Sequence, residues 1–199
     1  MGKLEDANIK SSYDRCPWCL GDELYTKYHD EEWGIPVRDS QKLFSALILD
    51  GAQAGLSWIT ILRRRDAYFN AFNNMNPEKI AFYSEKDIER LMGNAEIIRN
   101  KRKILSAIKN AQCYLELMEE AGSFSDWLWD WVNGVPIINH YKTLKDVPAS
   151  TELSENISKE LKKRGFSFVG PTIIYAFMQA CGLVNDHLVS CFCHIDNKS

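Results

Sequence analysis

The sequence predicts an all-α protein, and three observations support that prediction. Apolar residues recur at helical spacing from about residue 22 onward. No segment shows a convincing period-two alternation, which is the signal of a half-buried strand. Short groups of Gly, Pro and Asn separate the helical segments, as in a helical bundle. With 199 residues, 45% of them apolar and 26% charged, the chain can bury one sizeable core.

The first half of the chain begins with a charged stretch, residues 1–14, which we expect to be a disordered tail, with a single domain over residues 15–199. The segment SQKLFSALIL predicts a helix with Ser40 as its cap. One face of this helix is apolar, carrying Leu43, Phe44, Leu47 and Ile48. The segment LSWITIL continues the helical spacing with Leu56, Ile59 and Leu62.

Three further helices follow. Ser84 and Asp87 resemble a capping box that opens the segment SEKDIERLM. Residues Ile97 to Met118 form a long amphipathic pattern, and the tryptophan-rich segment SFSDWLWDWVNG starts at a serine cap and stops at Gly134. Because Trp127, Trp129 and Trp131 alternate, a helix cannot present all three on one face, and we interpret two of them as packing residues.

The segment LKKRGFSFVGPTIIYAFMQACGLVNDH predicts two helices joined by a tight turn. A basic helix ends at Gly165, and the second helix begins at Pro171 and Thr172, where proline is favoured. The free N–H groups at the start of such a helix can bind phosphate. An ordinary helical hairpin without that role fits the pattern as well.

Charge and hydropathy exclude two broad classes. A net charge of −3 argues against a surface that is basic throughout, and the clusters at residues 63–65, 99–103 and 162–164 taken alone are typical of solvated helix faces. No apolar run approaches the roughly 20 residues that span a bilayer. The charged N-terminus lacks the apolar block of a signal peptide, so we expect no membrane association and a cytoplasmic location.

The six cysteines are not expected to form disulfides in that compartment. Cys113 and Cys181 lie in apolar helical patterns and are interpreted as core residues. Four others lie near the two ends of the chain, in RCPWC and CFCH. With His29 and His187 they could supply a tetrahedral Cys₂His₂ metal site joining the ends. Cys19, Cys193 or His194 could replace one of the ligands, and CPWC could instead be a redox pair.

Aromatic residues are concentrated in the first third of the chain and flank polar segments. They are Trp18, Tyr25, Tyr28, Trp33 and Trp58. Such residues can form part of a core, or they can form a slot in which a flat ligand stacks.

Seven segments in this order resemble the 3-methyladenine DNA glycosylase I family. They are RCPWC, LYTKYHDEEWGIPVRDSQKLF, DGAQAGLSWITIL, DIERLM, IIRNKRKI, FSDWLWDWVNG and LKKRGFSFVGPTIIYAFMQACGLVNDH. The resemblance runs from about Arg15 to Cys191. It implies a helix-hairpin-helix glycosylase fold with the hairpin motif at about residues 154–182. It also implies two helical subdomains with the active site between them, and termini joined by a structural zinc.

The resemblance further implies which residues act. Zn²⁺ would be held by Cys16, His29, His187 and Cys191. Aromatic walls of the base pocket would come from Trp18, Tyr28, Trp33 and Trp58. Asp50, with the Tyr28 hydroxyl beside it, would serve as the catalytic carboxylate and bind the base edge. The family carries glutamate at this position, so Asp50 is one methylene shorter, and it could alternatively be a helix-end carboxylate bonded to backbone.

The same resemblance implies contacts with DNA. Gly55 and Leu56 would wedge into the duplex, while Gly165, Gly170 and Thr172 would hold the phosphate backbone. The activity implied is hydrolysis of the N-glycosidic bond of alkylated bases, chiefly 3-methyladenine, after base flipping in double-stranded DNA. None of the lysines in these motifs indicates Schiff-base chemistry, so we expect a monofunctional enzyme without lyase activity. We also expect it to be a monomer. Alternatives are a zinc-stapled protein that binds alkylation damage without cutting, and a purely structural helical domain.

Overall fold

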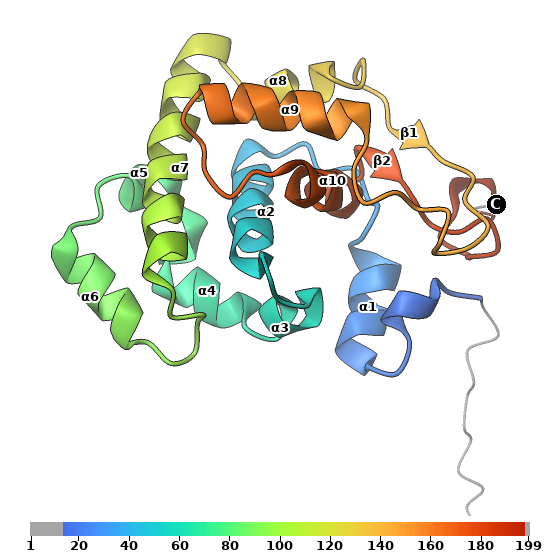
Figure 1. Ribbon diagram of the computed structural model, residues 1–199, viewed down its shortest axis with the longest axis horizontal. Helices are drawn as coiled ribbons and strands as arrows, with labels where there is room; N and C mark the ends of the chain where they lie inside the picture. The colour runs from blue at the N-terminus through green and yellow to red at the C-terminus, as the bar shows by residue number, and fades with distance from the viewer. Residues whose placement is uncertain (1–13, 198–199) are drawn as a thin grey trace, which may run out of the picture.

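The computed structural model describes residues 14–197, so the tail expected at residues 1–14 lies almost entirely outside them. Within this range the chain is mostly helical (Figure 1). The α-helices are α1 (Glu23–Glu31), α2 (Ser40–Gln53), α3 (Trp58–Leu62), α4 (Arg65–Ala71), α5 (Pro77–Ile80), α6 (Glu85–Gly93), α7 (Lys101–Ala121), α8 (Phe124–Asp130), α9 (Glu152–Lys163) and α10 (Pro171–Ala180). The 3₁₀ turns are η1 (Pro17–Cys19), η2 (Asn73–Met75) and η3 (Ile195–Asn197).

One pair of short strands modifies the all-α prediction. Strand β1 (Ile137–Ile138) runs parallel to β2 (Val184–Asn185), with Ile137 opposite Val184. Each strand has two residues, which is too short for an alternating pattern to be visible in the sequence. Among the described residues, no helix is both long enough and apolar enough to span a bilayer.

The helix boundaries confirm some sequence signals and correct others. The capping box of Ser84 and Asp87 is present at the start of α6, and Ser123 caps α8. The predicted cap Ser40 is wrong by one residue, because Asp39 accepts the hydrogen bond from the Lys42 N–H and Ser40 is the first helical residue. Helix α7 begins at Lys101, four residues later than the apolar pattern, because the Asn100 side chain caps it there.

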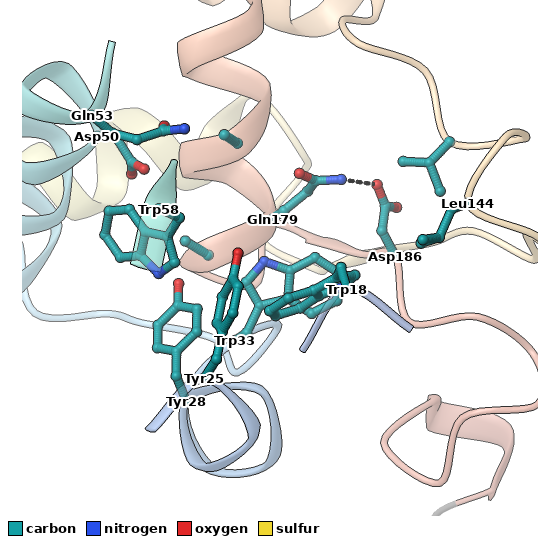
Figure 2. A pocket seen from close by; sticks show the side chains of 13 residues that line it. Trp18, Tyr25, Tyr28, Trp33, Asp50, Gln53, Trp58, Leu144, Gln179 and Asp186 are labelled. Carbon is teal, nitrogen blue, oxygen red and sulfur yellow. Dashed lines mark hydrogen bonds between the residues drawn. The ribbon is translucent and has the colours of Figure 1, made fainter. Parts of the chain in front are cut away.

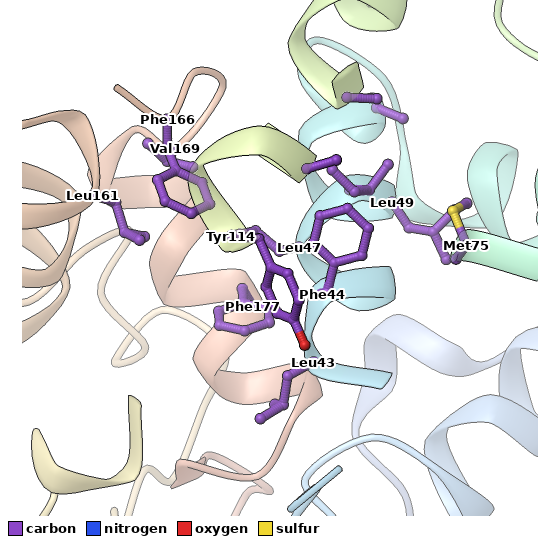
Figure 3. Packing of buried hydrophobic residues seen from close by; sticks show 14 of the residues in the cluster. Leu43, Phe44, Leu47, Leu49, Met75, Tyr114, Leu161, Phe166, Val169 and Phe177 are labelled. Carbon is purple, nitrogen blue, oxygen red and sulfur yellow. The ribbon is translucent and has the colours of Figure 1, made fainter. Parts of the chain in front are cut away.

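The core is packed between α2, α7 and α10 (Figure 3). The rings of Phe44 on α2 and Tyr114 on α7 lie 4.9 Å apart, and Phe177 of α10 is fully buried beside them. Each such side chain contributes about 1.5–3 kcal/mol of transfer free energy when it is buried. Cys113 and Cys181 are buried in this same core, as predicted.

The alternating tryptophans all pack against the core, but to different depths. Trp129 is buried, and its indole N–H donates to the Val37 carbonyl at 2.8 Å. Trp127 and Trp131 are half-buried and meet edge to face at 6.1 Å. Trp129 thereby attaches the segment before α2 to α8, two regions far apart in the sequence.

Helices α9 and α10 form a hairpin whose turn is fixed from outside as well as from within (Figure 1). The Ser158 hydroxyl donates to the Val169 carbonyl at 2.6 Å. The Asn110 amide of α7 bonds Ser167 twice, donating to its carbonyl at 2.9 Å and accepting from its N–H at 2.8 Å. Helix α10 then begins at Pro171, as predicted, with Gly170 as its cap.

Several basic side chains of the three clusters are paired within the protein. Arg65 forms two hydrogen bonds with Glu32, and Arg164 bonds both Glu120 and Glu160. Arg63 pairs with Asp22. Arg63 and Lys163 are exposed, as expected of solvated helix faces, whereas Arg65 and Arg164 are half-buried against their partners. These contacts remove three arginines from the set available for a ligand.

Asn110 provides a test of the fixed hairpin. We expect Asn110→Ala to lower the free energy of unfolding by about 1–3 kcal/mol, because it leaves the Ser167 N–H and carbonyl without partners. Denaturant titration monitored by circular dichroism measures this change. Glu116→Ala, an exposed substitution on the same helix, is the control and should shift stability by less than about 0.5 kcal/mol. Equal effects of the two substitutions would contradict the assignment.

Candidate active site and metal cluster

Four residues from the two ends of the chain meet in one buried cluster, formed by Cys16, His29, His187 and Cys191. The facing nitrogens of His29 (Nε2) and His187 (Nδ1) are 3.2 Å apart. The Cys191 sulfur lies 3.4 Å from the first and 3.6 Å from the second. Ligand atoms bound about 2.0–2.3 Å from one tetrahedral ion lie roughly 3.3–3.8 Å from each other. The cluster therefore has the spacing and the donors for one metal ion.

Contacts around the cluster orient both imidazole rings. His29 Nδ1 lies 2.8 Å from the Asp30 carboxylate, which is itself held by Arg15 at 2.8 Å. His187 Nε2 lies 3.0 Å from the Trp33 carbonyl. In each ring the nitrogen away from the cluster faces a hydrogen-bond acceptor, which leaves a lone pair on the nitrogen that faces the cluster.

Gly34 makes room for this arrangement. Its φ of +78° lies in the left-handed region, and a Cβ at this position would lie 2.9 Å from His187 Nε2. There is thus a steric reason for the glycine that ends YHDEEWG, because any side chain at position 34 would contact the His187 ring.

The other cysteines and histidines suggested as ligands lie outside this foursome. Cys19 donates to the Cys16 carbonyl at 3.1 Å, and Cys193 lies with His29 and Asp30 in a neighbouring group. His194 lies with His140 and Asp196 in a third group. All six cysteines are free thiols, and Cys16 belongs to the buried cluster, so the CPWC segment does not form a disulfide in this structure.

An aromatic cavity of about 310 Å³ lies next to the cluster (Figure 2). Trp18, Tyr25, Tyr28 and Trp33 from the N-terminal segment line one side of it. The Trp18 and Trp33 rings meet at 5.0 Å, and Trp58, at the start of α3, lies 5.5 Å from Tyr28. This is the size and wall chemistry of a site for a flat organic ligand.

Asp50 lines the same cavity from α2 and is only 3% exposed. Its Oδ2 has no hydrogen-bond partner among the described residues, and neither has the buried indole nitrogen of Trp58. Burial raises the pKa of the Asp50 carboxyl well above its usual value and, with Asp50 nearby, raises the pKa of Tyr28. Asp50 lies in the last turn of α2, and its side chain is not bonded to backbone there, so the alternative of a helix-end carboxylate bonded to backbone does not apply.

The loop between α2 and α3 projects at the edge of this cavity. Gly55 has a φ of +78°, and Leu56 is 37% exposed despite being apolar. Lys103 braces the loop, since its ammonium group donates to the carbonyls of Ala52 and Ala54, each at 2.7 Å. Lys103 is thus the member of a basic cluster that supports the loop, and burial lowers its pKa.

The residues expected to contact DNA lie apart from the metal cluster. Gly165 and Gly170 bound the turn of the α9–α10 hairpin, and Thr172 is exposed in the first turn of α10. The N–H groups of such a first turn have no carbonyl partner within their own helix.

Sequence reasoning missed part of the cavity lining. Gln53 follows Asp50 by three residues and shares its helix face, so helical spacing could have identified it. Leu144 and Val147 come from the loop after β1, and no local signal marked them. Asp186, beside the cluster residue His187, also lines the cavity. It accepts hydrogen bonds from Asn139, Tyr175 and Gln179 at 2.5–2.7 Å, which satisfies its carboxylate.

A second cavity, of about 680 Å³, lies behind the first and shares Tyr28, Asp50, Trp58 and Ala180 with it. Its remaining lining includes polar residues such as Glu32 and Arg65, which bond each other. Trp18 and Trp33 line the first cavity alone. The smaller cavity therefore has the wall of contacting aromatic rings, although the other cavity is larger.

The chain is similar in sequence to known glycosylases. A family described as methyladenine glycosylase matches residues 18–194. The DNA-3-methyladenine glycosylase 1 of Escherichia coli K12 is 50% identical over 185 residues, which cover 93% of this chain and 99% of that protein. The corresponding Haemophilus influenzae enzyme is 49% identical over 179 residues, 90% of this chain and 97% of that protein.

Solved structures agree. A crystal structure of a 3-methyladenine DNA glycosylase I superposes with a TM-score of 0.89 at 50% identity, covering 91% of this chain and all of that one. The Staphylococcus aureus enzyme, in a structure on the basis of 3-methyladenine recognition, gives 0.87 at 40% identity over 89% of this chain and 94% of that one.

The helical fold and the sequence are thus those of a glycosylase, an enzyme that hydrolyses N-glycosyl bonds. The chain belongs to the methyladenine glycosylase family.

Gly34 provides a test of the metal cluster. We expect Gly34→Ala to lower metal affinity by about 10- to 100-fold, because the new methyl group displaces His187 from its Trp33 contact. Competition with a chromophoric chelator measures this affinity. Gly21→Ala is the matched control, because Gly21 also has a positive φ but no atom lies within 4 Å of its added Cβ. An equal loss of metal affinity in both variants would mean that backbone strain, rather than the clash with His187, causes the loss. Wild-type affinity in Gly34→Ala would contradict the steric role of Gly34.

Proposed function

We propose that this protein excises 3-methyladenine from double-stranded DNA as a monomeric, monofunctional glycosylase of cytoplasmic base-excision repair. The observation that carries the proposal is the buried, unpartnered carboxyl of Asp50 inside an aromatic cavity. Membership of the family supports it, since relatives at about half identity are named as enzymes of this activity.

The cavity suits a cationic purine. Adenine methylated at N3 in DNA carries a positive charge, and aromatic faces attract flat cations. In the protein alone burial favours the neutral form of Asp50, whereas a cation beside it favours the carboxylate. The lesion therefore supplies the counter-charge that the buried carboxyl lacks, while an uncharged normal base does not. The unpartnered Trp58 N–H offers a donor in the same space.

The rest of the site can bring the base into this cavity. A duplex hides the glycosidic bond, so the nucleotide must be extruded at a cost of a few kcal/mol. Leu56, held outward by the Lys103 brace, is placed to fill the gap that extrusion leaves. The helix-hairpin-helix motif that we assign to α9 and α10 offers the free N–H groups at the start of α10 to a phosphate.

The reaction needs little from the protein once the base is in place. The bond from the sugar C1′ to N9 breaks, and its electron pair neutralises the charge on the base. The oxygen of a water molecule then bonds to C1′ and its proton is released to solvent. Asp50 holds the base edge and Tyr28 and Trp58 border it, so the protein orients the leaving group. None of the described residues that line the cavity is a lysine, in keeping with hydrolysis without a Schiff base.

Zinc is the metal that best fits the buried cluster, because two cysteines and two histidines form a closed tetrahedral set for that ion. Bound there it would stabilise the fold by joining the two chain ends, with no part in the chemistry. The residues that would hold it are Cys16, His29, His187 and Cys191.

The proposed function is tested by base release. Purified protein is incubated with methylated and with unmethylated duplex DNA, and the free bases are separated chromatographically. We expect 3-methyladenine from the methylated DNA alone, with no protein–DNA adduct after borohydride treatment. Binding of damaged DNA without release would favour the alternative, a zinc-stapled damage-binding protein. A trapped adduct would contradict the monofunctional mechanism.

Asp50→Asn tests the role of the carboxyl. We expect the rate of 3-methyladenine release to fall about 10²-fold or more, because the amide cannot acquire the negative charge that stabilises the bound cation. Single-turnover kinetics on methylated DNA measure it. Asp66→Asn, which neutralises an exposed carboxylate at the edge of the second cavity, is the control and should keep the wild-type rate. Full activity of Asp50→Asn would remove Asp50 from the mechanism.

Asp50→Asn also tests, through the pH dependence of stability, whether burial raises the pKa of Asp50. Because the folded protein binds the Asp50 proton more tightly than the unfolded chain, stability falls as pH rises from about 4 to the raised pKa. The amide of the Asp50→Asn variant cannot ionise, so we expect its melting temperature relative to wild type to be higher at about pH 8 than at about pH 4. Each 1 kcal/mol corresponds to about 2–4 °C. A pH-independent difference would mean that folding does not raise the pKa of Asp50.

A further inference from the structure

All four histidines of the chain lie in clusters of potential metal ligands, and only two of them belong to the cluster already described. The other two, His140 and His194, lie with Asp196 at the C-terminal end of the described chain. His140 Nε2 is 3.1 Å from the Asp196 carboxylate, and His194 Nδ1 is 3.6 Å from the same oxygen. One ligand atom from each residue lies within 4.8 Å of the other two.

His194 is built in the same way as the cluster residue His187. Its ring is fully buried, and its Nε2 lies 3.0 Å from the Asn139 carbonyl, to which it can only donate. Its Nδ1 therefore carries the lone pair, in agreement with the long 3.3 Å hydrogen bond that it accepts from the Asp196 N–H. A carbonyl that fixes the tautomer and turns the other nitrogen toward neighbouring ligands is typical of metal-binding histidines.

The backbone that carries these residues is tied together. The loop after β1 and the C-terminal segment lie side by side (Figure 1), joined by the Val189 N–H bond to the Tyr141 carbonyl at 3.0 Å. The Asn197 amide donates to the carbonyls of Val189 and Cys191, which fixes η3, the turn that carries Asp196. The three side chains thus project from a braced frame, which lowers the entropic cost of binding an ion.

We propose that His140, His194 and Asp196 form a second metal site for a borderline divalent cation such as Zn²⁺. Two imidazole nitrogens and one carboxylate oxygen suit Zn²⁺, Co²⁺, Ni²⁺ or Cu²⁺ and disfavour Mg²⁺ and Ca²⁺. His140 and Asp196 are each 61% exposed, so the site is open to water, which completes the coordination. Its affinity is therefore lower than that of the closed Cys/His cluster.

The site would also act on the aromatic cavity. His140 begins the loop that continues to Leu144 and Val147, both of which line that cavity. Asn139, whose carbonyl orients His194, bonds Asp186 at the cavity wall through its side chain. An ion at the second site would fasten this loop to the C-terminal segment and so hold one wall of the cavity in place.

The test compares metal stoichiometry between wild type and His140→Ala. Each protein, as purified, is dialysed against micromolar Zn²⁺, and the bound zinc is measured. We expect wild type to bind one equivalent more than His140→Ala, and Asp196→Asn to match His140→Ala. Lys142→Ala, an exposed substitution in the same loop, is the control and should bind as wild type does.

The test depends on the difference in bound zinc between wild type and His140→Ala. Zinc in the Cys/His cluster contributes equally to both proteins and does not affect this difference. Co²⁺ gives a second readout, because thiolate charge-transfer absorption arises from the Cys/His cluster alone. Loss of one equivalent with that absorption unchanged supports the second site. Equal stoichiometry in wild type and His140→Ala, or extra zinc that binds only at millimolar concentration, would overturn the proposal and leave His140 and Asp196 as a surface ion pair.

Discussion

The Cys/His cluster is the contact on which the aromatic cavity depends. Trp18 and Trp33 pack in a small buried group around Cys16 and Cys191, which is separate from the main core. They are therefore placed against α10 and β2 chiefly through the cluster that joins the two chain ends. Of the elements that carry the cavity, α2 and α10 belong to the main core, whereas η1 lies in the group around Cys16 and Cys191. Helix α1 is attached both by that group and by the Arg63–Asp22 and Arg65–Glu32 pairs. Loss of the cluster would release Cys16 and His29 from the C-terminal segment and so loosen the wall formed by Trp18 and Trp33.

The cavity itself is organised around an electrostatic conflict. Burying a carboxyl without a partner costs free energy, and a core apolar residue in place of Asp50 would be more stable. A cationic ligand supplies the counter-charge that the buried carboxyl lacks and so offsets this free-energy cost. An uncharged base does not offset it, and the cavity therefore selects for the cation. The fully satisfied Asp186, on the opposite side of the cavity, shows the contrast. Its three donors come from this chain, so its role is to fix the wall.

Local signals in the sequence predicted local structure well. Caps such as Ser84 and Ser123, and the proline that opens α10, mark helix ends because the responsible contacts are within a few residues. The four cluster residues could be named only through the family resemblance, because spacing alone left Cys19, Cys193 and His194 as alternative ligands. Features that rest on long-range contacts gave no such signal. Three features join segments about 50 residues apart or more. They are the β1–β2 pair, the contact of Leu144 with the cavity, and the bonds of Asn110 to the hairpin.

A crystal structure of the protein soaked with 3-methyladenine would show whether the cavity beside Asp50 receives the methylated base. We expect the purine among Trp18, Tyr28 and Trp58, with a polar edge atom within about 3.2 Å of the Asp50 carboxyl. A purine bound only in the second cavity, or one that leaves Asp50 without a contact, would contradict this expectation.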